Sequence, residues 1–258
     1  MVKISDRLKT AASLIREGAG LADVGTDHGY VPIYLLEQKK IKSAIAMDIN
    51  KGPLERAREH IHLYGMDAYI QTRLSDGVAA LEKGEADSIL IAGMGGGLVM
   101  HILEEGKDIC QAAGELILQP QSELCSVREY LAENGYVTEA ERMVFEDGKY
   151  YPMMRVHYQA EKNEDADKAI KDMENSKEQK KSKQVPLTEE QLLAIYGRYL
   201  LMEKNPVLHQ YLVKERQVFE NILDNLFKQP ESEKIAVRME EVKEALGYNE
   251  AALAYYRT

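Results

Sequence analysis

Two carboxylates alternate with two glycines in one short stretch near the amino terminus, Asp23-Val24-Gly25-Thr26-Asp27-His28-Gly29. The apolar residues before it and the helical pattern after it predict a buried strand that turns sharply into a helix. Glycines permit such a turn and the close approach of a ligand, and the first turn of a helix presents free N–H groups. A dinucleotide-binding loop would instead read Gly-x-Gly-x-x-Gly and hold a pyrophosphate. Carboxylates repel phosphate and favour a cationic ligand with an amine, a description that S-adenosylmethionine fits.

Two further predicted strands end in residues that could bind the rest of such a ligand. Ser43–Asp48 is an apolar strand that ends in an acid, and Asp48, followed by Ile49, could accept the hydroxyls of a ribose. The third strand, Ala68–Arg73, is followed by Ser75-Asp76-Gly77, where an aspartate could accept a hydrogen bond from the amino group of an adenine.

A fourth predicted strand, Asp87–Ala92, breaks into the glycine-rich segment Gly93-Met94-Gly95-Gly96-Gly97. Parallel strands end at the same edge of a sheet, so these four strand ends should meet in one crevice. A tight turn without a ligand would also explain the glycines, but the preceding strand ends favour a binding site.

The chain at this point resembles the bacterial tRNA adenine-22 N1-methyltransferases. The resemblance is close over residues 1–160, looser in the tail, and carried by five segments: Asp23–Tyr30, Met47-Asp48, Ser75–Gly77, Ala92–Gly96 and Leu118–Gln121. Other nitrogen methyltransferases usually place Asn/Asp-Pro-Pro-aromatic where this chain has Ala-Gly-Met-Gly-Gly. The resemblance implies a Rossmann-like class I methyltransferase sheet, mostly parallel with an antiparallel last strand. It also implies S-adenosylmethionine as cofactor and tRNA as partner.

The resemblance and the strand ends together predict three sets of site residues. Cofactor would be bound by Asp23, Gly25, Asp27, Gly29, Asp48, Ile49, Ser75, Asp76, Gly77 and Gly93. The transferred methyl group and the acceptor base would meet Asp27, His28, Gly93, Met94, Gly95 and Gly96. Substrate would contact Arg7, Tyr30, Gln119, Pro120 and Tyr151. His28 could hydrogen-bond the base or cap the helix, and the sequence does not separate these roles.

Composition favours a folded cytoplasmic protein but does not by itself favour an RNA partner. The chain has 258 residues, of which 45% are hydrophobic and 29% charged, with two cysteines and a net charge of −10. An acidic protein attracts a polyanion weakly, so tRNA binding rests on the resemblance. No segment is long and apolar enough for a membrane span, and no spacing of histidines or cysteines predicts a metal site. The oligomeric state stays open, with a monomer favoured.

The remaining pattern predicts two domains, a methyltransferase domain over residues 1–160 and a helical, coiled-coil domain over residues 161–258. In the first, helices are expected at 4–17, 51–64, 76–83, 98–105 and 122–134, a fifth strand at 114–119, and a hairpin of strands 136–145 and 151–158. A charged linker or exposed helix spans 160–184, and Thr188 caps the first of three amphipathic helices.

Three other functions are compatible with the residues alone. A methyltransferase for a small molecule or another RNA position would suit the negative charge. A nicotinamide-dependent oxidoreductase would share the sheet, although the acids of the first loop argue against it. A non-catalytic binding module would use the fold only as a scaffold.

Overall fold

The computed structural model describes residues 2–160, 188–230 and 232–257. They belong to two compact units, Met1–Asp167 and Lys168–Thr258, which we describe separately. The linker or exposed helix predicted over residues 160–184 lies outside the described residues from residue 161 on. The boundary predicted after residue 160 therefore remains a prediction.

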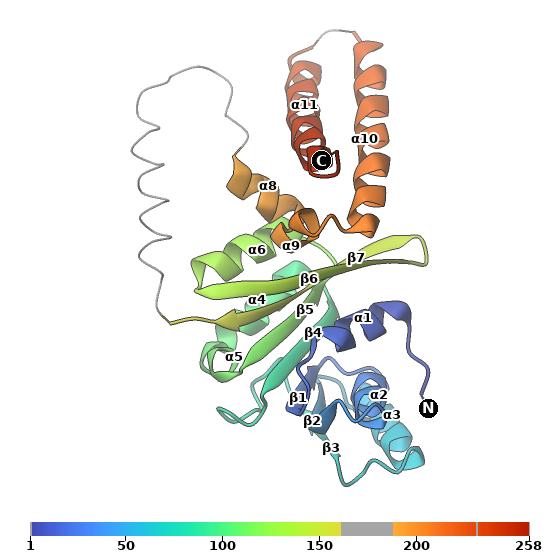
Figure 1. Cartoon of the computed structure of the whole chain (residues 1–258), viewed down its shortest axis with the longest axis vertical. Coiled ribbons are helices and arrows are strands. Elements are labelled where there is room, and N and C mark those ends of the chain that lie inside the picture. Colours follow the sequence, from blue (N-terminus) through green and yellow to red (C-terminus); the bar gives the residue numbers. More distant parts are fainter. Residues whose placement is uncertain (1, 161–187, 231, 258) are drawn as a thin grey trace. The chain divides into compact units, whose positions relative to one another are not determined.

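The amino-terminal unit contains one seven-stranded sheet with the order β3-β2-β1-β4-β5-β7-β6 (Figure 1). The strands are β1 Ala19–Val24, β2 Ile41–Asp48, β3 Ile70–Leu74, β4 Ser88–Met94, β5 Glu115–Pro120, β6 Tyr136–Glu146 and β7 Lys149–Tyr158. Strands β1 to β5 pair in parallel, and β7 is antiparallel to both of its neighbours. The predicted fold class is thus confirmed, including the antiparallel last strand.

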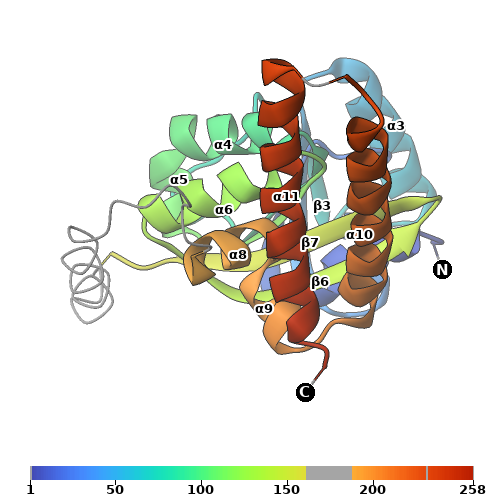
Figure 2. The same cartoon turned by 90° about the horizontal axis from the view of Figure 1, so that it is seen from above.

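Helices cover both faces of this sheet. They are α1 Asp6–Leu14, α2 Tyr30–Glu37, α3 Lys51–Leu63, α4 Gly96–Glu105, α5 Lys107–Ala112 and α6 Leu124–Glu133. Side chains of α1, α2 and α3 form one core cluster with the sheet, and those of α4, α5 and α6 form the other. Figure 2 shows α4, α5 and α6 gathered together and apart from α3.

Successive residues of the central strands feed these two clusters alternately. In β1, Leu21 packs in the first cluster and Ala22 in the second. Side chains of a strand point to opposite faces in turn, so a strand that is covered on both sides is apolar throughout. This explains why β1, β4 and β5 appear in the sequence as continuous apolar runs.

Two features of the amino-terminal unit differ from what the sequence predicted. The helix expected at 76–83 is wrong, because these residues form turns. The hydroxyl of Ser75 accepts a hydrogen bond from the Ala80 N–H (3.0 Å) and donates to the Gly77 carbonyl (2.9 Å), and this side chain competes with helical bonds. The short helix α5 was not predicted.

The hairpin of β6 and β7 is confirmed. Its turn residues, Asp147 and Gly148, both have left-handed backbones, with φ of 48° and 78°. Two successive left-handed residues match the twist of the flanking strands, and Asp-Gly adopts this conformation readily.

The carboxy-terminal unit is helical: α8 Glu189–Tyr196, α9 Arg198–Met202, α10 Pro206–Phe227 and α11 Glu233–Ala254. The first predicted helix breaks at Gly197, whereas the predicted cap is confirmed, since the Thr188 side chain accepts a hydrogen bond from the Gln191 N–H. Helices α10 and α11 lie side by side (Figures 1 and 2). Glu215 accepts bonds from Tyr196, Tyr211 and Asn249, which ties α8, α10 and α11 together. No described helix is long and apolar enough to cross a membrane.

Candidate active site

Asp23, at the end of β1, is a buried carboxyl group with one hydrogen-bonding side-chain partner. Thr26 donates to its Oδ2 at 2.6 Å, and only 6% of the residue is exposed. The pKa of Asp23 is raised to about 6, mainly by burial and in smaller part by the nearby Asp27 and Asp48, against the lowering effect of the Thr26 bond. The buried charge of Asp23 is disfavoured beside two other carboxylates, so a bound cation would stabilise it.

The glycine at position 25 leaves room for a residue of another strand. A Cβ built on Gly25 would overlap the terminal methyl group of Met94, the last residue of β4. Met94 therefore packs directly on the loop after β1. Its methyl group occupies the volume that a side chain at position 25 would need.

His28 is fixed by contacts with two other rings. The ring centroids of His28 and Tyr30 are 5.2 Å apart and nearly parallel, and those of Tyr30 and His60 are 4.9 Å apart. The His60 ring also hydrogen-bonds the His28 carbonyl through Nδ1 (3.1 Å). His60, on α3, was not among the predicted site residues, because its partner lies on another element and a lone histidine carries no sequence signal.

Asp27 lies beside these rings and is largely exposed. Its Oδ1 is 3.3 Å from His28 Nε2 and 3.9 Å from an Arg56 nitrogen. Its side chain is 77% exposed. This carboxylate therefore remains accessible to a ligand at the mouth of the loop.

The ends of β2 and β3 lie at the same sheet edge. The Asp48 Oδ1 accepts from the Asn50 N–H at 2.7 Å, and Ile49 is 58% exposed. The Ser75 N–H donates to the Asp48 carbonyl at 3.0 Å, which joins the two strand ends. The Ser75 side chain is used inside its own turn, whereas Asp76 is exposed.

Gly93 interrupts the pairing of β4 with β5 and is bound by a buried side chain. The register shifts between Ala92 and Met94, and Gly93 has φ of 81°, a left-handed conformation that favours glycine. Its N–H donates to Gln119 Oε1 at 3.1 Å, and Arg7 Nη1 donates to the same oxygen at 2.7 Å. Arg7 in turn lies 5.4 Å above the Tyr151 ring. Four predicted residues, three of them from the substrate set, thus contact one another.

The remaining glycines of this segment are held by residues that the sequence did not single out. Gly96 donates to the Ser122 hydroxyl at 3.1 Å, and Gly97 donates to Glu123 Oε2 at 2.7 Å. A Cβ on Gly96 would lie 2.5 Å from the Ser122 carbonyl oxygen, so close packing alone requires a glycine there. Gly93 and Gly95 are exposed, and Gly96 is buried.

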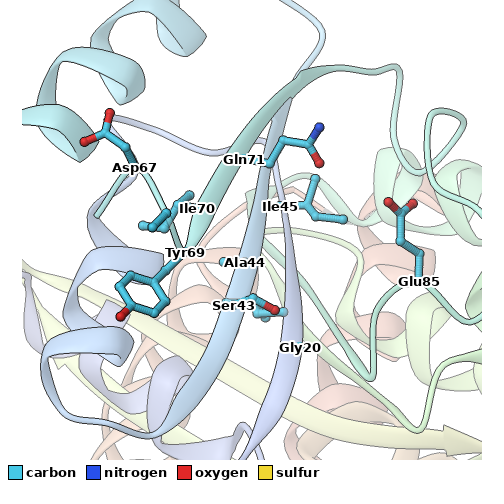
Figure 3. Close-up of a pocket in the computed structure, with 11 residues that line it drawn as sticks. Gly20, Ser43, Ala44, Ile45, Asp67, Tyr69, Ile70, Gln71 and Glu85 are labelled. Carbon is cyan, nitrogen blue, oxygen red and sulfur yellow. The ribbon is translucent and has the colours of Figure 1, made fainter. Parts of the chain in front are cut away.

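A hollow of about 420 Å³ lies at the other end of the strands (Figure 3). It is lined by the first residues of β1, by Ser43 to Ile45 of β2 and by the segment entering β3. Of its two acids, Asp67 and Glu85, the second is engaged with Arg73 at 2.7 Å, which holds the pKa of that carboxyl down at about 2. The hollow is therefore separate from the strand-end site. Among the described residues, no group of three or more His, Cys, Asp or Glu could hold a metal ion.

The strand order and the acidic loop define a class of protein. The sheet is parallel except for an antiparallel strand inserted beside its edge strand, and its first loop carries carboxylates, which a phosphate-binding loop would lack. This is the arrangement of a Rossmann-like methyltransferase. The family described as "Methyltransferase domain" matches residues 4–154.

Comparison with known proteins identifies the kind of methyltransferase that this chain resembles. The tRNA (adenine(22)-N(1))-methyltransferase of Bacillus subtilis (strain 168) is 42% identical over 153 residues, which are 59% of this chain and 64% of that protein. The crystal structure of the B. subtilis m1A22 tRNA methyltransferase TrmK matches with 31% identity and a TM-score of 0.78, over 98% of this chain and 100% of that one. Sp1610 of Streptococcus pneumoniae, solved in complex with S-adenosyl-L-methionine, matches with 31% identity and a TM-score of 0.76, over 97% and 100%. The chain belongs to this TrmK-like family of methyltransferases.

Proposed function

We propose that this protein transfers the methyl group of S-adenosylmethionine to N1 of adenine 22 in tRNA. The observation that carries the proposal is the meeting of Asp23, Asp27 and Asp48 where β1 and β2 end side by side, with the Thr26 N–H bound to the Met47 carbonyl at 2.7 Å, close to the exposed Gly93. The donor and acceptor named here are those of the relatives, and the likeness to TrmK extends over both units.

The residues present fit a cationic donor. Asp23 is buried with a raised pKa, so an ammonium group beside it would stabilise its charged form. Asp48 has one oxygen engaged by the Asn50 N–H, and its carboxylate can accept ribose hydroxyls. When bound, S-adenosylmethionine supplies an electrophilic methyl group on a sulfonium.

The acceptor requires positioning more than acid–base chemistry. Adenine N1 has a lone pair in the plane of the ring, so no base is needed before transfer. The chain must align N1 with the methyl group and exclude water. Gly93 and Gly95 present a surface without side chains, and Asp27 can stabilise the positive charge that develops on the methylated base. Because N1 lies on the Watson–Crick edge, the base must be unpaired or extruded.

The decisive experiment is mass spectrometry of nucleosides from unmodified tRNA incubated with the protein and isotopically labelled donor. We expect labelled N1-methyladenosine at position 22. Label at another position, or none in tRNA, would overturn the proposal.

Asp48→Ala tests the donor assignment. It should abolish donor binding in calorimetry while leaving the folded structure intact, because Asp48 is a strand-end residue outside the two core clusters. Unchanged donor affinity would remove Asp48 from the site.

The role in tRNA modification and the two free thiols, Cys110 and Cys125, also favour a cytoplasmic location.

A further inference from the structure

Gln119 joins two parts of the site through one oxygen atom. The side chain is fully buried, and its Oε1 accepts from both the Arg7 guanidinium and the Gly93 N–H. The backbone of Gly93 and the head of Arg7 are therefore held at a fixed spacing. A Cβ on Gly93 would lie 3.6 Å from Arg7 Nη1, which shows how closely the guanidinium borders this glycine.

The groups that contact the Arg7 guanidinium are uncharged. Its contacts are an amide oxygen and the face of Tyr151, and no carboxylate in the described part of the chain lies within ion-pair distance of it. Arg16, Arg73 and Arg128, by contrast, each pair with a glutamate. A guanidinium has five N–H donors, and here the described residues engage one of them. Arg7 therefore keeps both its charge and most of its donors available.

One further hydrogen-bond donor lies beside Gly93. The Gln121 Nε2 would lie 3.8 Å from a Cβ on Gly93, on the same exposed surface. A planar fork of donors with full positive charge matches the oxygens of a phosphate.

We infer that Gln119 is a positioning residue, which holds Arg7 beside Gly93 so that its guanidinium binds one backbone phosphate of the RNA next to the target adenine. This inference rests on the proposed function and adds a specific contact to it. Because Gln119 is uncharged, it orients Arg7 without neutralising it. A glutamate at this position would orient Arg7 equally well but would cancel its charge.

The test is the salt dependence of tRNA binding by the full chain, measured without methyl transfer. Each phosphate contact contributes about 0.7 to 0.9 to the slope of log K against log salt. Arg7→Ala should lower the magnitude of the slope by that amount and weaken binding roughly tenfold at moderate salt. Gln119→Glu keeps an acceptor for the Gly93 N–H and should lower the slope equally. Arg7→Lys should restore the slope in part.

The matched control is Lys9→Ala, which removes one positive charge from the same helix. Lys9 is exposed and already bound to Asp6 at 2.8 Å, so the slope should not change. Donor affinity should be the same in all four variants. A wild-type slope in Arg7→Ala, even with slower methylation, would overturn the inference, since the guanidinium would then act on the base or on the fold. Absence of tRNA methylation by the wild-type protein would instead contradict the proposed function.

Discussion

The contribution of Asp23 to the free energy of unfolding depends on pH. In the folded protein its pKa is about 6, against 3.8 for a free aspartate, and burial is the main cause. Below the unfolded value both states are protonated, and the folded protein keeps the full contribution of this group to stability. As the pH rises through about 6, the buried group must ionise, and about 3 kcal/mol of that contribution is lost.

Replacing this group should therefore stabilise the protein without ligand. Asp23→Asn should raise the free energy of unfolding by up to about 3 kcal/mol at pH 7.5 and have little effect at pH 4. Urea denaturation at both pH values measures this. Asp108→Asn, at an exposed aspartate of α5, is the control and should change little at either pH. An equal effect of Asp23→Asn at both pH values would contradict the assignment.

The same carboxyl group should make donor binding depend on pH. Only its ionised form attracts an ammonium group, so the donor affinity of the wild-type protein should increase roughly tenfold between pH 5 and pH 7. Calorimetry across this range measures it. In Asp23→Asn the affinity should be low and flat, and a wild-type pH profile in this variant would rule out Asp23 as the cause.

At the scale of single residues, the sequence predicted the acids of the candidate site but not the residues that support its backbone. Asp23, Asp48 and Asp76 could be predicted because each follows an apolar run at a strand end. Ser122, Glu123 and His60 could not, because each acts on a backbone group of a distant segment. Contacts between residues far apart in the sequence produce no regular spacing from which they could be predicted.

Among the elements, glycines serve two purposes that a matched pair of variants can separate. Gly148 has a left-handed backbone and nothing within 4 Å of an added Cβ, whereas Gly96 has an ordinary backbone and a carbonyl oxygen at 2.5 Å. Backbone strain alone should cost Gly148→Ala about 1 kcal/mol, with no change in kcat.

Gly96→Ala should lower the free energy of unfolding by about 2 kcal/mol and also lower kcat, because the segment at Ser122 must move away from the loop after β4. Denaturant titration and single-turnover methylation give the two readouts. An unchanged kcat in Gly96→Ala would mean that this loop does not position the acceptor.

The order of helices and strands could be predicted from the apolar runs that also located the acids. Apolar runs separated by helical periodicity define a doubly wound sheet, and Asp147-Gly148 marks the hairpin. The turn at 76–83 was missed because the Ser75 hydroxyl replaces helical hydrogen bonds, a local competition that apolar spacing does not report.

On the scale of the whole molecule, an acidic protein needs many contacts to bind a polyanion such as tRNA. The net charge is −10, and every residue of the proposed site belongs to the amino-terminal unit. A fragment of residues 1–160 should therefore bind the donor with unchanged affinity, whereas its KM for tRNA should rise at least tenfold through loss of the helical unit. Calorimetry and initial-rate kinetics test the two parts, and an unchanged KM would limit RNA recognition to the first unit.

The contact between Gly25 and Met94 has a consequence for how this protein can diverge. The two positions share one volume, although they are far apart along the chain. A larger residue at position 25 would need both a displaced or smaller side chain at 94 and a residue that tolerates the left-handed backbone of this loop, whose φ is 74°. Aligned descendants should therefore keep glycine at 25, and any exception should be asparagine or aspartate accompanied by a smaller residue at 94.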